Sequence, residues 1–160
     1  MLANRIDQSF NQIDKNNLPN YLSGLFENLV AEYSSFDFYN MKPDISKASH
    51  DKQILLKEKT SLGLLIFEAM VFKDGVFTGP HTHAEYFVEK IIHGNLEEIQ
   101  YKKIDVFFKT KQTIIRTSKD SPRLINCPIF FPHNVRAING NAHSFCLSLG
   151  DTPIKTIDVR

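Results

Sequence analysis

The sequence is poor in the features that mark several common classes of protein. It has no tryptophan, only two cysteines, and no apolar run close to the roughly 18 residues that a membrane span needs. Its 19 basic and 18 acidic residues leave a formal net charge of +1 and are dispersed along the chain. The sequence therefore carries no electrostatic footprint for a nucleic acid or an anionic membrane. A small molecule is the expected partner.

Cysteine is too scarce to hold the fold together by disulfides. Cys127 and Cys146 lie in apolar, strand-like stretches and lack the spacing of a disulfide framework. We expect both to be buried free thiols. Residues 1–10 lack the apolar core and the small-residue cleavage site of a secretion signal. The expected location is therefore the cytoplasm, with the protein a monomer or a homodimer.

The first part of the chain has a helical pattern. Apolar residues recur at three- and four-residue steps from Leu18 to Tyr33, which predicts an amphipathic helix. Asn17 and Pro19 stand where a cap and a first-turn proline are favoured. A shorter pattern of the same period over residues 6–13 predicts a second helix.

The sequence pattern changes after Pro43 to short apolar or alternating runs separated by Gly, Pro, Asn and Asp. This pattern is typical of consecutive antiparallel strands. Clusters of turn-forming residues at 73–75, 93–95, 120–122 and 139–141 favour hairpins between them. The expected strands are 53–57, 63–72, 83–92, 96–101, 112–118, 124–126, 129–131, 134–138 and 143–149.

Many short strands after a helical segment predict a mainly β fold, a small barrel or jelly roll with helices packed on one side. The length of 160 residues is typical of one domain with a core of its own. We expect a single domain over residues 1–160, with a helical lead-in over 1–42 and a β-barrel over 43–160. The lysines between 102 and 111 are interpreted as solvated edges and loops.

Three histidines have a spacing that suits one metal ion. His81 and His83 lie at positions i and i+2 of an extended segment, so both imidazoles project to the same face. His133 follows a proline and the apolar run 129–131, where the chain can deliver a third imidazole. Neutral imidazole is a ligand for Fe, Zn, Cu and Ni. The pattern predicts a mononuclear metal held by His81, His83 and His133.

The other histidines are not expected to be ligands. His93 precedes Gly94 in a predicted turn and faces the surface by strand parity, and His50 lies in a polar loop. His143 is expected on the strand face opposite Cys146. Since the three ligands must be unprotonated, metal affinity is expected to fall as the pH drops below about 6.5.

A family resemblance begins at the same histidines. The segment 79–83, Gly-Pro-His-Thr-His, followed by ten residues and then Gly94, resembles the first motif of the cupin superfamily. Pro132-His133 resembles the histidine of the second motif. A metal-binding glutamate usually lies seven residues before the closing glycine, and that position is Phe87 here. The missing acid, together with segments 90–98 and 133–138, resembles the cysteine dioxygenase branch, whose iron is held by three histidines.

The resemblance covers roughly two thirds of the chain. It implies a cupin-type double-stranded β-helix, or jelly-roll barrel, with the N-terminal helices packed on it. It also implies a non-haem Fe(II) that binds a small thiol and O2 and gives a sulfinic acid, with Zn, Ni or Mn as alternative metals. Coordination to a metal favours the thiolate. Three neutral ligands leave more of the metal's charge for an anionic sulfur.

The supporting residues of that branch are not all present. Its Ser-x-His-x-Tyr stretch corresponds to Cys146, Ser148 and Gly150, so the hydroxyl and imidazole relay is lost. Tyr86, Cys146 and Ser148 are left as catalytic candidates.

The substrate-binding and fourth-ligand positions also differ from the branch. The region of its carboxylate-binding arginine reads 54–59 here and contains lysines, of which Lys57 is our candidate. A lysine binds a carboxylate as a point charge and not as a fork, which disfavours cysteine itself as the substrate. Glu85 and Glu89 are candidates for a fourth metal ligand, because a one-residue change of register exchanges the two faces of a strand.

Two other functions remain open at this point. One is a different metal-dependent cupin enzyme that acts on a substrate other than a thiol. The other is a non-catalytic cupin that binds or senses a small molecule or a metal.

Overall fold

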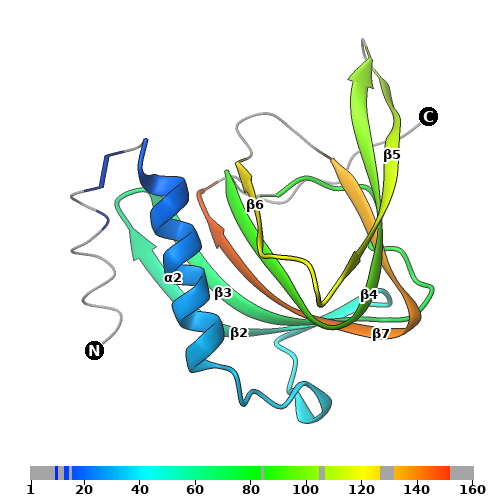
Figure 1. Cartoon of the computed structure of the whole chain (residues 1–160), viewed down its shortest axis with the longest axis horizontal. Helices are drawn as coiled ribbons and strands as arrows, with labels where there is room; N and C mark the ends of the chain where they lie inside the picture. Colours follow the sequence, from blue (N-terminus) through cyan, green and yellow to red (C-terminus); the bar gives the residue numbers. More distant parts are fainter. Residues whose placement is uncertain are drawn as a thin grey trace.

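The computed structural model describes Phe10 and residues 13–14, 16–83, 85–104, 107–126 and 132–151. The described part is mainly antiparallel β-sheet, as the sequence predicts, and it contains one α-helix (Figure 1). The elements in chain order are the helix α2 (Leu18–Glu32), the short 3-10 helix η1 (Phe38–Asn40), and the strands β1 (Ile45–Ser46), β2 (His50–Thr60), β3 (Gly63–Phe72), β4 (Tyr86–Ile104), β5 (Phe107–Thr117), β6 (Arg123–Asn126) and β7 (His133–Leu149).

The strands form one curled, seven-stranded sheet. Its order is β1-β2-β3-β7-β4-β5, and β6 pairs with the first part of β4. The last strand, β7, therefore lies between β3 and β4, which places residues from the two ends of the β region side by side. This crossed order is typical of jelly-roll folds. Figure 1 shows the sheet curling, with α2 against its outer face.

The helix α2 packs on the sheet through an apolar stripe. Leu18, Leu22, Phe26 and Leu29 are buried at helical spacing, and the ring of Phe26 meets Phe67 of β3 edge to face with centroids 6.1 Å apart. Pro occupies the first turn as predicted, but the Asn17 side chain makes no capping hydrogen bond. The predicted second helix over 6–13 lies largely outside the described residues, although Phe10 is buried in the same cluster.

Two of the predicted hairpin turns are wrong. Segments 83–92 and 96–101 belong largely to the single strand β4, and 134–138 and 143–149 belong to the single strand β7. Gly94 (φ 78°), Asn139 (φ 62°) and Gly140 (φ 111°) do adopt the positive φ angles that their sequence suggests. The backbone bends there and the pairing of β4 with β7 changes register, but neither strand reverses.

The bends in β4 and β7 curl the sheet so that it encloses a second apolar cluster. β4 pairs with β7 on both sides of the bend, so the two strands wrap around a second apolar cluster on the face away from α2. As predicted, the turn at 73–75 follows β3, and the turn at 120–122 joins β5 to β6. The predicted strand 129–131 and Cys127 lie outside the described residues. The inner cluster contains Met70, Phe72, Phe87, Ile91, Leu96, Val135, Ala137, Ala142 and Cys146.

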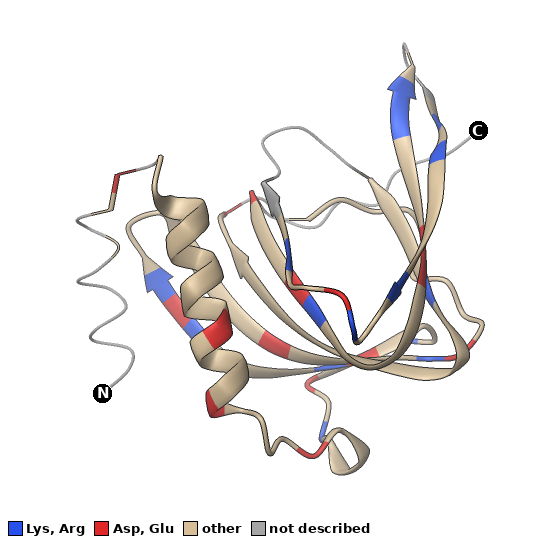
Figure 2. Ribbon diagram, viewed as in Figure 1, with Lys and Arg blue, Asp and Glu red and all other residues tan. Residues whose placement is uncertain are grey.

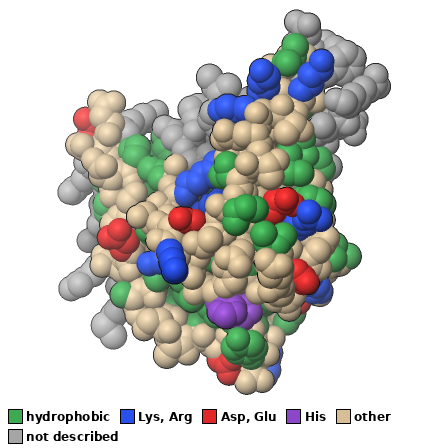
Figure 3. All heavy atoms as spheres, turned by 45° about the vertical axis from the view of Figure 1, so that its right-hand side comes forward, with side chains coloured by type: hydrophobic (Ala, Val, Ile, Leu, Met, Phe, Trp, Pro, Cys, Tyr) green, Lys and Arg blue, Asp and Glu red, His purple; other side chains and the backbone are tan. Residues whose placement is uncertain are grey.

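Charged side chains of both signs are spread over the strands (Figure 2). The predicted solvated lysines Lys102, Lys103 and Lys109 are exposed near the end of the β4 and β5 ribbon, where basic groups project in the space-filling view (Figure 3). None of the described helices is long and apolar enough to span a membrane.

Gly94→Ala tests the bend in β4. A Cβ at this position would lie 2.7 Å from the Asn141 carbonyl oxygen and 2.9 Å from the Ala142 Cα, both of them backbone atoms. We expect urea denaturation to show a loss of unfolding free energy of about 1–2 kcal/mol from the positive φ, and about 1–3 kcal/mol more from overpacking.

Gly75→Ala is the matched control, because Gly75 has a similar φ of 72° and an added Cβ meets nothing within 4 Å. This variant is expected to lose only the conformational part. Equal losses in the two variants would contradict the close approach of β4 and β7 at the bend.

Candidate metal centre

A short backbone bridge brings two of the predicted ligands together. His81 and His133 form an isolated antiparallel pair, in which each backbone N–H donates to the carbonyl of the other at 2.9 Å. The segment from 79 to 83 thus joins the start of β7, although 52 positions separate the two histidines in number (133 minus 81). This pairing explains how a histidine far along the chain completes the His-x-His pair.

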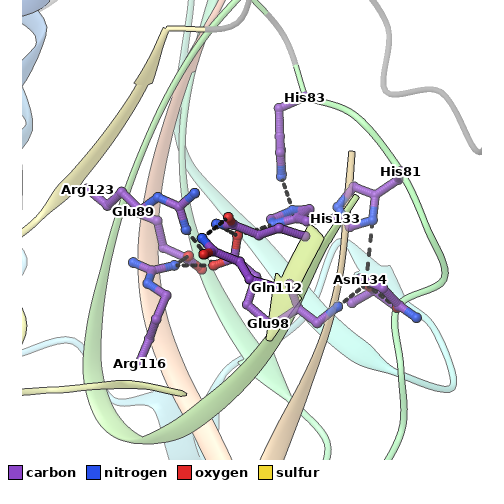
Figure 4. A network of polar contacts seen from close by, with 12 residues as sticks. His81, His83, Glu89, Glu98, Gln112, Arg116, Arg123, His133 and Asn134 are labelled. Atoms are coloured by element: carbon purple, nitrogen blue, oxygen red, sulfur yellow. Dashed lines mark hydrogen bonds and ion pairs between the residues drawn. The ribbon is translucent and has the colours of Figure 1, made fainter. Parts of the chain in front are cut away.

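The three imidazoles converge on one point. The ligand atoms of His81, His83 and His133 all lie within 4.8 Å of one another, and the Nε2 atoms of His83 and His133 are 2.6 Å apart. In Figure 4, His83 points toward His133 and His81 lies beside it; the ring centroid of His81 is 4.9 Å from that of His83 and 4.7 Å from that of His133. The structure therefore brings together the three residues that the sequence predicts as ligands.

Hydrogen bonds fix the tautomers of two of these rings. Because a carbonyl oxygen only accepts, Nδ1–H of His81 donates to the Gly79 oxygen at 2.8 Å. Nδ1–H of His133 donates to Oε1 of Glu98 at 3.0 Å, since an ionised carboxylate also only accepts. Each of these two rings is left with an unprotonated Nε2 as its available ligand atom. Such outer contacts are typical of histidines that bind metals, so these residues fit a divalent first-row metal ion.

Burial keeps His81 and His83 neutral. Desolvation first, and then the charge of His133, lower the pKa of His81 to about 3, and the same two causes hold the pKa of His83 well below its usual 6.5. Protons therefore compete for His81 and His83 only at a lower pH than the value near 6.5 that the sequence led us to expect.

Phe87 takes the place of the missing acid. Its ring stacks on His83, with centroids 3.8 Å apart and an angle of 22° between the planes. The residue is buried and faces the same cavity as the three histidines. An aromatic wall thus stands where a glutamate ligand would otherwise project.

A carboxylate does approach the centre, but from outside it. Glu98 of β4 is 1% exposed, and it accepts hydrogen bonds from His133, Gln100 (3.0 Å) and Arg123 (2.5 Å). Burial opposes ionisation of Glu98, but the hydrogen bond and charge of His133 and the charge of Arg123 hold its pKa below the usual value. Glu98 is therefore an anion that orients His133 and raises the basicity of its Nε2.

A second acid completes this network. Glu89 of β4 forms a buried ion pair with Arg116 of β5 and accepts a hydrogen bond from Ser144 at 3.2 Å. The Arg116 guanidinium also lies 3.7 Å from Glu98. Two buried acids thus face two arginines, Arg116 and Arg123, across β4, β5 and β6 (Figure 4).

The predicted fourth ligands lie in different environments. Glu89 lines the cavity, but its two oxygens contact Arg116 and Ser144, so it would have to leave both to reach a metal. Glu85 is exposed and does not belong to the lining of the cavity. Among the described residues, only the three histidines meet within 4.8 Å at this point.

The cavity beside the three histidines has a volume of about 110 Å³. One wall is apolar and consists of Met70, Phe72, Phe87 and Val135. The polar side chains that line it, besides the three histidines, are Lys47, His50, Lys52, Thr78 and Glu89.

Lys57 is not where the sequence placed it. It is exposed on β2 and does not line the cavity. Lys52, five residues earlier on the same strand, does line it, and its Nζ lies 2.9 Å from Glu68 Oε1. The bulge between Ile54 and Leu56 changes the register of β2 with β3, which strand parity alone does not reveal.

The catalytic candidates lie beside the cavity or away from it. Tyr86 is half-buried and packs on the cluster under α2, while Ser148 is half-buried near the end of β7. The Cys146 thiol contacts the sulfur of Met70 at 3.3 Å, and burial raises its pKa well above the usual value. None of the three lines the cavity.

The sequence interpretation of the other histidines is correct for two and wrong for one. His93 is exposed, and His143 stacks on Phe38, on the face opposite Cys146. His50 does not lie in a polar loop: it begins β2, is 6% exposed, and lines the cavity. Burial and then the charges of Lys52 and Lys47 lower its pKa to about 4.

Sequence reasoning missed Glu98, Arg116, Arg123, His50 and Lys52. One signal was available: Glu98 has the strand parity of Leu96, which is fully buried, so its charge points into the barrel. Apart from Gln100 of the same strand, the partners of Glu98 come from β5, β6 and β7, and their proximity follows only from the sheet order.

Comparisons with known proteins identify the fold. No family profile matches the sequence, and no curated protein is similar enough in sequence to match. Among solved structures, the chain is similar to peruvianin-I, a cysteine peptidase from Thevetia peruviana latex (TM-score 0.52, 14% identity, 78% of this chain and 77% of that chain).

Two further similar structures are KdgF from Halomonas and an oxalate decarboxylase from Bacillus subtilis. For KdgF the TM-score is 0.52 at 13% identity, over 73% of this chain and 94% of that chain. For the decarboxylase the TM-score is 0.53 at 14% identity, over 73% of this chain and 30% of that chain. Identities this low establish the fold alone, and the chain has the cupin fold.

Glu98→Gln tests the hydrogen bond behind His133. Gln keeps the shape but removes the charge, so we expect the affinity for Zn²⁺ or Co²⁺ to fall by about 10- to 100-fold in a competition titration against a chelator. Glu97→Gln is the matched control: Glu97 is the adjacent residue of β4 and pairs with Arg136. Equal affinities of the two variants would rule out an orienting role for Glu98.

The buried His50 makes the stability of the metal-free protein depend on pH. Its pKa is about 6.5 when the chain is unfolded and about 4 when it is folded. Below pH 6.5, His50 therefore binds a proton in the unfolded chain but not in the folded chain. The free energy of unfolding consequently falls as the pH drops toward 4.

We expect His50→Gln to reduce this loss. Urea denaturation with a chelator present, at pH 7 and pH 5, measures it in a window above the titration of most carboxylates. The same change in unfolding free energy in the variant and the wild type would contradict a neutral, buried His50.

Proposed function

We propose that the protein is an Fe(II)-dependent enzyme that oxidises a small thiol bearing an acidic group to a sulfinic acid. The observation that supports this most is the donor set: three imidazoles whose ligand atoms lie within 4.8 Å of one another, with Phe87 in place of an acid ligand. Neutral ligands leave the charge of the metal to be compensated by an anionic substrate atom, and a thiolate is such an atom.

The overall reaction is balanced by its two substrates alone. A thiol R–SH and one O2 give R–SO2H, so both oxygen atoms join the sulfur, which loses the four electrons that O2 gains. Bound Fe(II) would supply the Lewis acidity and the redox chemistry. The residues of this chain orient His133 through Glu98, and exclude water with the apolar wall that includes Phe72 and Phe87.

The acidic group of the substrate is suggested by the lysines of the cavity. Lys52 is largely buried, with 13% of its side chain exposed, and Lys47 lines the same space. A volume of about 110 Å³ has room for a ligand of several non-hydrogen atoms, because one water occupies on the order of 10–15 Å³ by this measure. A short mercapto acid satisfies both the charge and the size.

The relay of the cysteine dioxygenase branch has no counterpart at its usual positions. Gly150 has a φ of 136°, and a Cβ there would lie 3.2 Å from the Glu85 nitrogen, so a tyrosine does not fit at this point of the backbone. Cys146 is a buried, protonated thiol. The proposed reaction therefore needs a polar contact to the substrate from another part of the cavity.

A second candidate is a metal-dependent enzyme acting on a small acid that has no thiol. One similar structure is an oxalate oxidase in complex with the substrate analogue glycolate (TM-score 0.52, 13% identity, 77% of this chain and 63% of that chain). The lysines of the cavity suit such acids equally well. A sensor without turnover is the third possibility, and it predicts tight binding with no product.

Oxygen uptake by the iron-loaded protein tests the leading proposal. We expect 3-mercaptopropionate and mercaptoacetate to consume one O2 per thiol, faster than with the same amount of free iron. His133→Ala should reduce uptake to the rate of free iron because it removes a ligand, whereas the exposed His93→Ala should retain it. Absence of uptake above free iron with every thiol would eliminate the thiol reaction.

Lys52→Met tests the acid-binding wall. Loss of a charged contact should raise KM for 3-mercaptopropionate by roughly 10-fold or more, with a smaller change in kcat. Lys57→Met, on the exposed face of the same strand, is the control and should behave as the wild type. A thermal melt checks that the loss of the pair with Glu68 has not unfolded the variant, and an unchanged KM would contradict the assignment.

A further inference from the structure

His50, a residue that lines the cavity, has a buried polar atom without a hydrogen-bond partner. Its ring is buried, with 6% of the residue exposed, and its Nδ1 shares a 2.9 Å hydrogen bond with the Ser49 hydroxyl. Its Nε2 is buried and lacks a hydrogen-bond partner, and it is the one such side-chain atom found among the described residues. Leaving a buried polar group unpaired destabilises the fold, so such an atom needs an explanation.

The position of His50 supplies that explanation. His50 lines the same cavity as His81, His83 and His133, but it does not belong to the group whose ligand atoms meet within 4.8 Å. It projects from the start of β2, where it pairs with Phe72 of β3, another lining residue. The imidazole is thus part of the cavity wall, apart from the proposed metal position.

The surroundings of His50 indicate what it can bind. The cations near this wall are Lys47 and Lys52, both of which lower the pKa of His50. The charge of Asp51 acts in the opposite direction, but Asp51 is held by Ser46 and Lys73. A neutral imidazole beside two ammonium groups suits an anionic ligand atom, provided that Nε2 carries the proton. It does so when the Ser49 hydroxyl donates to Nδ1, which the 2.9 Å contact allows.

We propose that Nε2–H of His50 donates a hydrogen bond to the acidic group of the substrate bound in this cavity. This inference rests on the proposed function for the position of the reacting end, and it adds the residue that selects the other end. His50 acts together with Lys52: the lysine supplies charge, while the imidazole supplies a directed donor. A substrate without an acidic tail leaves Nε2 unpaired and binds less tightly.

The test uses the whole protein loaded with Co(II), whose absorption reports ligands at the metal without requiring turnover. Binding of 3-mercaptopropionate is followed by the thiolate-to-cobalt charge-transfer band, and 1-propanethiol is the matched probe without an acidic group. Glycolate, followed by the change in the cobalt d–d bands, is the probe without a thiol. Cobalt stoichiometry and a thermal melt are recorded for every variant.

His50→Phe keeps an aromatic ring and removes the donor. We expect it to weaken binding of 3-mercaptopropionate by about 10-fold or more and to leave binding of 1-propanethiol within about 2-fold. His50→Gln keeps an N–H near the position of Nε2 and should restore most of the affinity. His93→Phe, at an exposed histidine outside the cavity, is the control and should bind both thiols as the wild type does.

The outcomes separate this inference from the proposed function. If no thiol gives a charge-transfer band but His50→Phe weakens glycolate binding about 10-fold, the role of His50 stands and the thiol reaction fails. If His50→Phe binds both 3-mercaptopropionate and glycolate as the wild type does, the role of His50 is overturned, whatever the reaction. Equal weakening of 3-mercaptopropionate and 1-propanethiol at full cobalt loading would also overturn it.

Discussion

The candidate metal centre depends on the hydrogen bonds and ion pairs of one buried carboxylate, that of Glu98. It accepts a hydrogen bond from His133 and ion pairs with Arg123, and Arg116 links it to Glu89. Through these contacts a single side chain of β4 connects β5, β6 and the first residue of β7. Removing one partner from a buried ion network leaves an uncompensated charge at a cost of about 3–5 kcal/mol, so the network holds its members in one arrangement.

The network also supplies negative charge near the centre, although the usual metal-binding acid is missing. Phe87 occupies that position and stacks on His83, yet negative charge still acts on the centre indirectly, through the hydrogen bond that His133 donates to Glu98. All protein ligands of the ion can thus be neutral, while the hydrogen bond to Glu98 makes one of them, His133, more basic. Lys47, His50 and Lys52 line the same cavity. The cavity therefore combines three imidazoles that suit a metal with cationic and polar groups that suit an acid.

The sequence predicted what local patterns determine. The helix from Leu18, the positive φ angles at Gly94 and Gly140, and the three converging histidines all follow from residue type and spacing. The sequence alone could not show whether these glycines end four short strands or bend two long ones. The answer depends on how β4 and β7 pair. His50 and Lys52 were missed for a similar reason: whether the start of β2 faces solvent or the cavity depends on β3 and on a bulge.

X-ray absorption spectroscopy at the metal edge tests the central claim most directly. For the protein loaded with one equivalent of Zn²⁺, the account predicts three imidazole ligands, with Zn–N distances of about 2.0–2.1 Å, and the loss of one imidazole in His133→Ala. A first shell with fewer than two imidazoles, or one that His133→Ala leaves unchanged, would contradict a centre built from His81, His83 and His133.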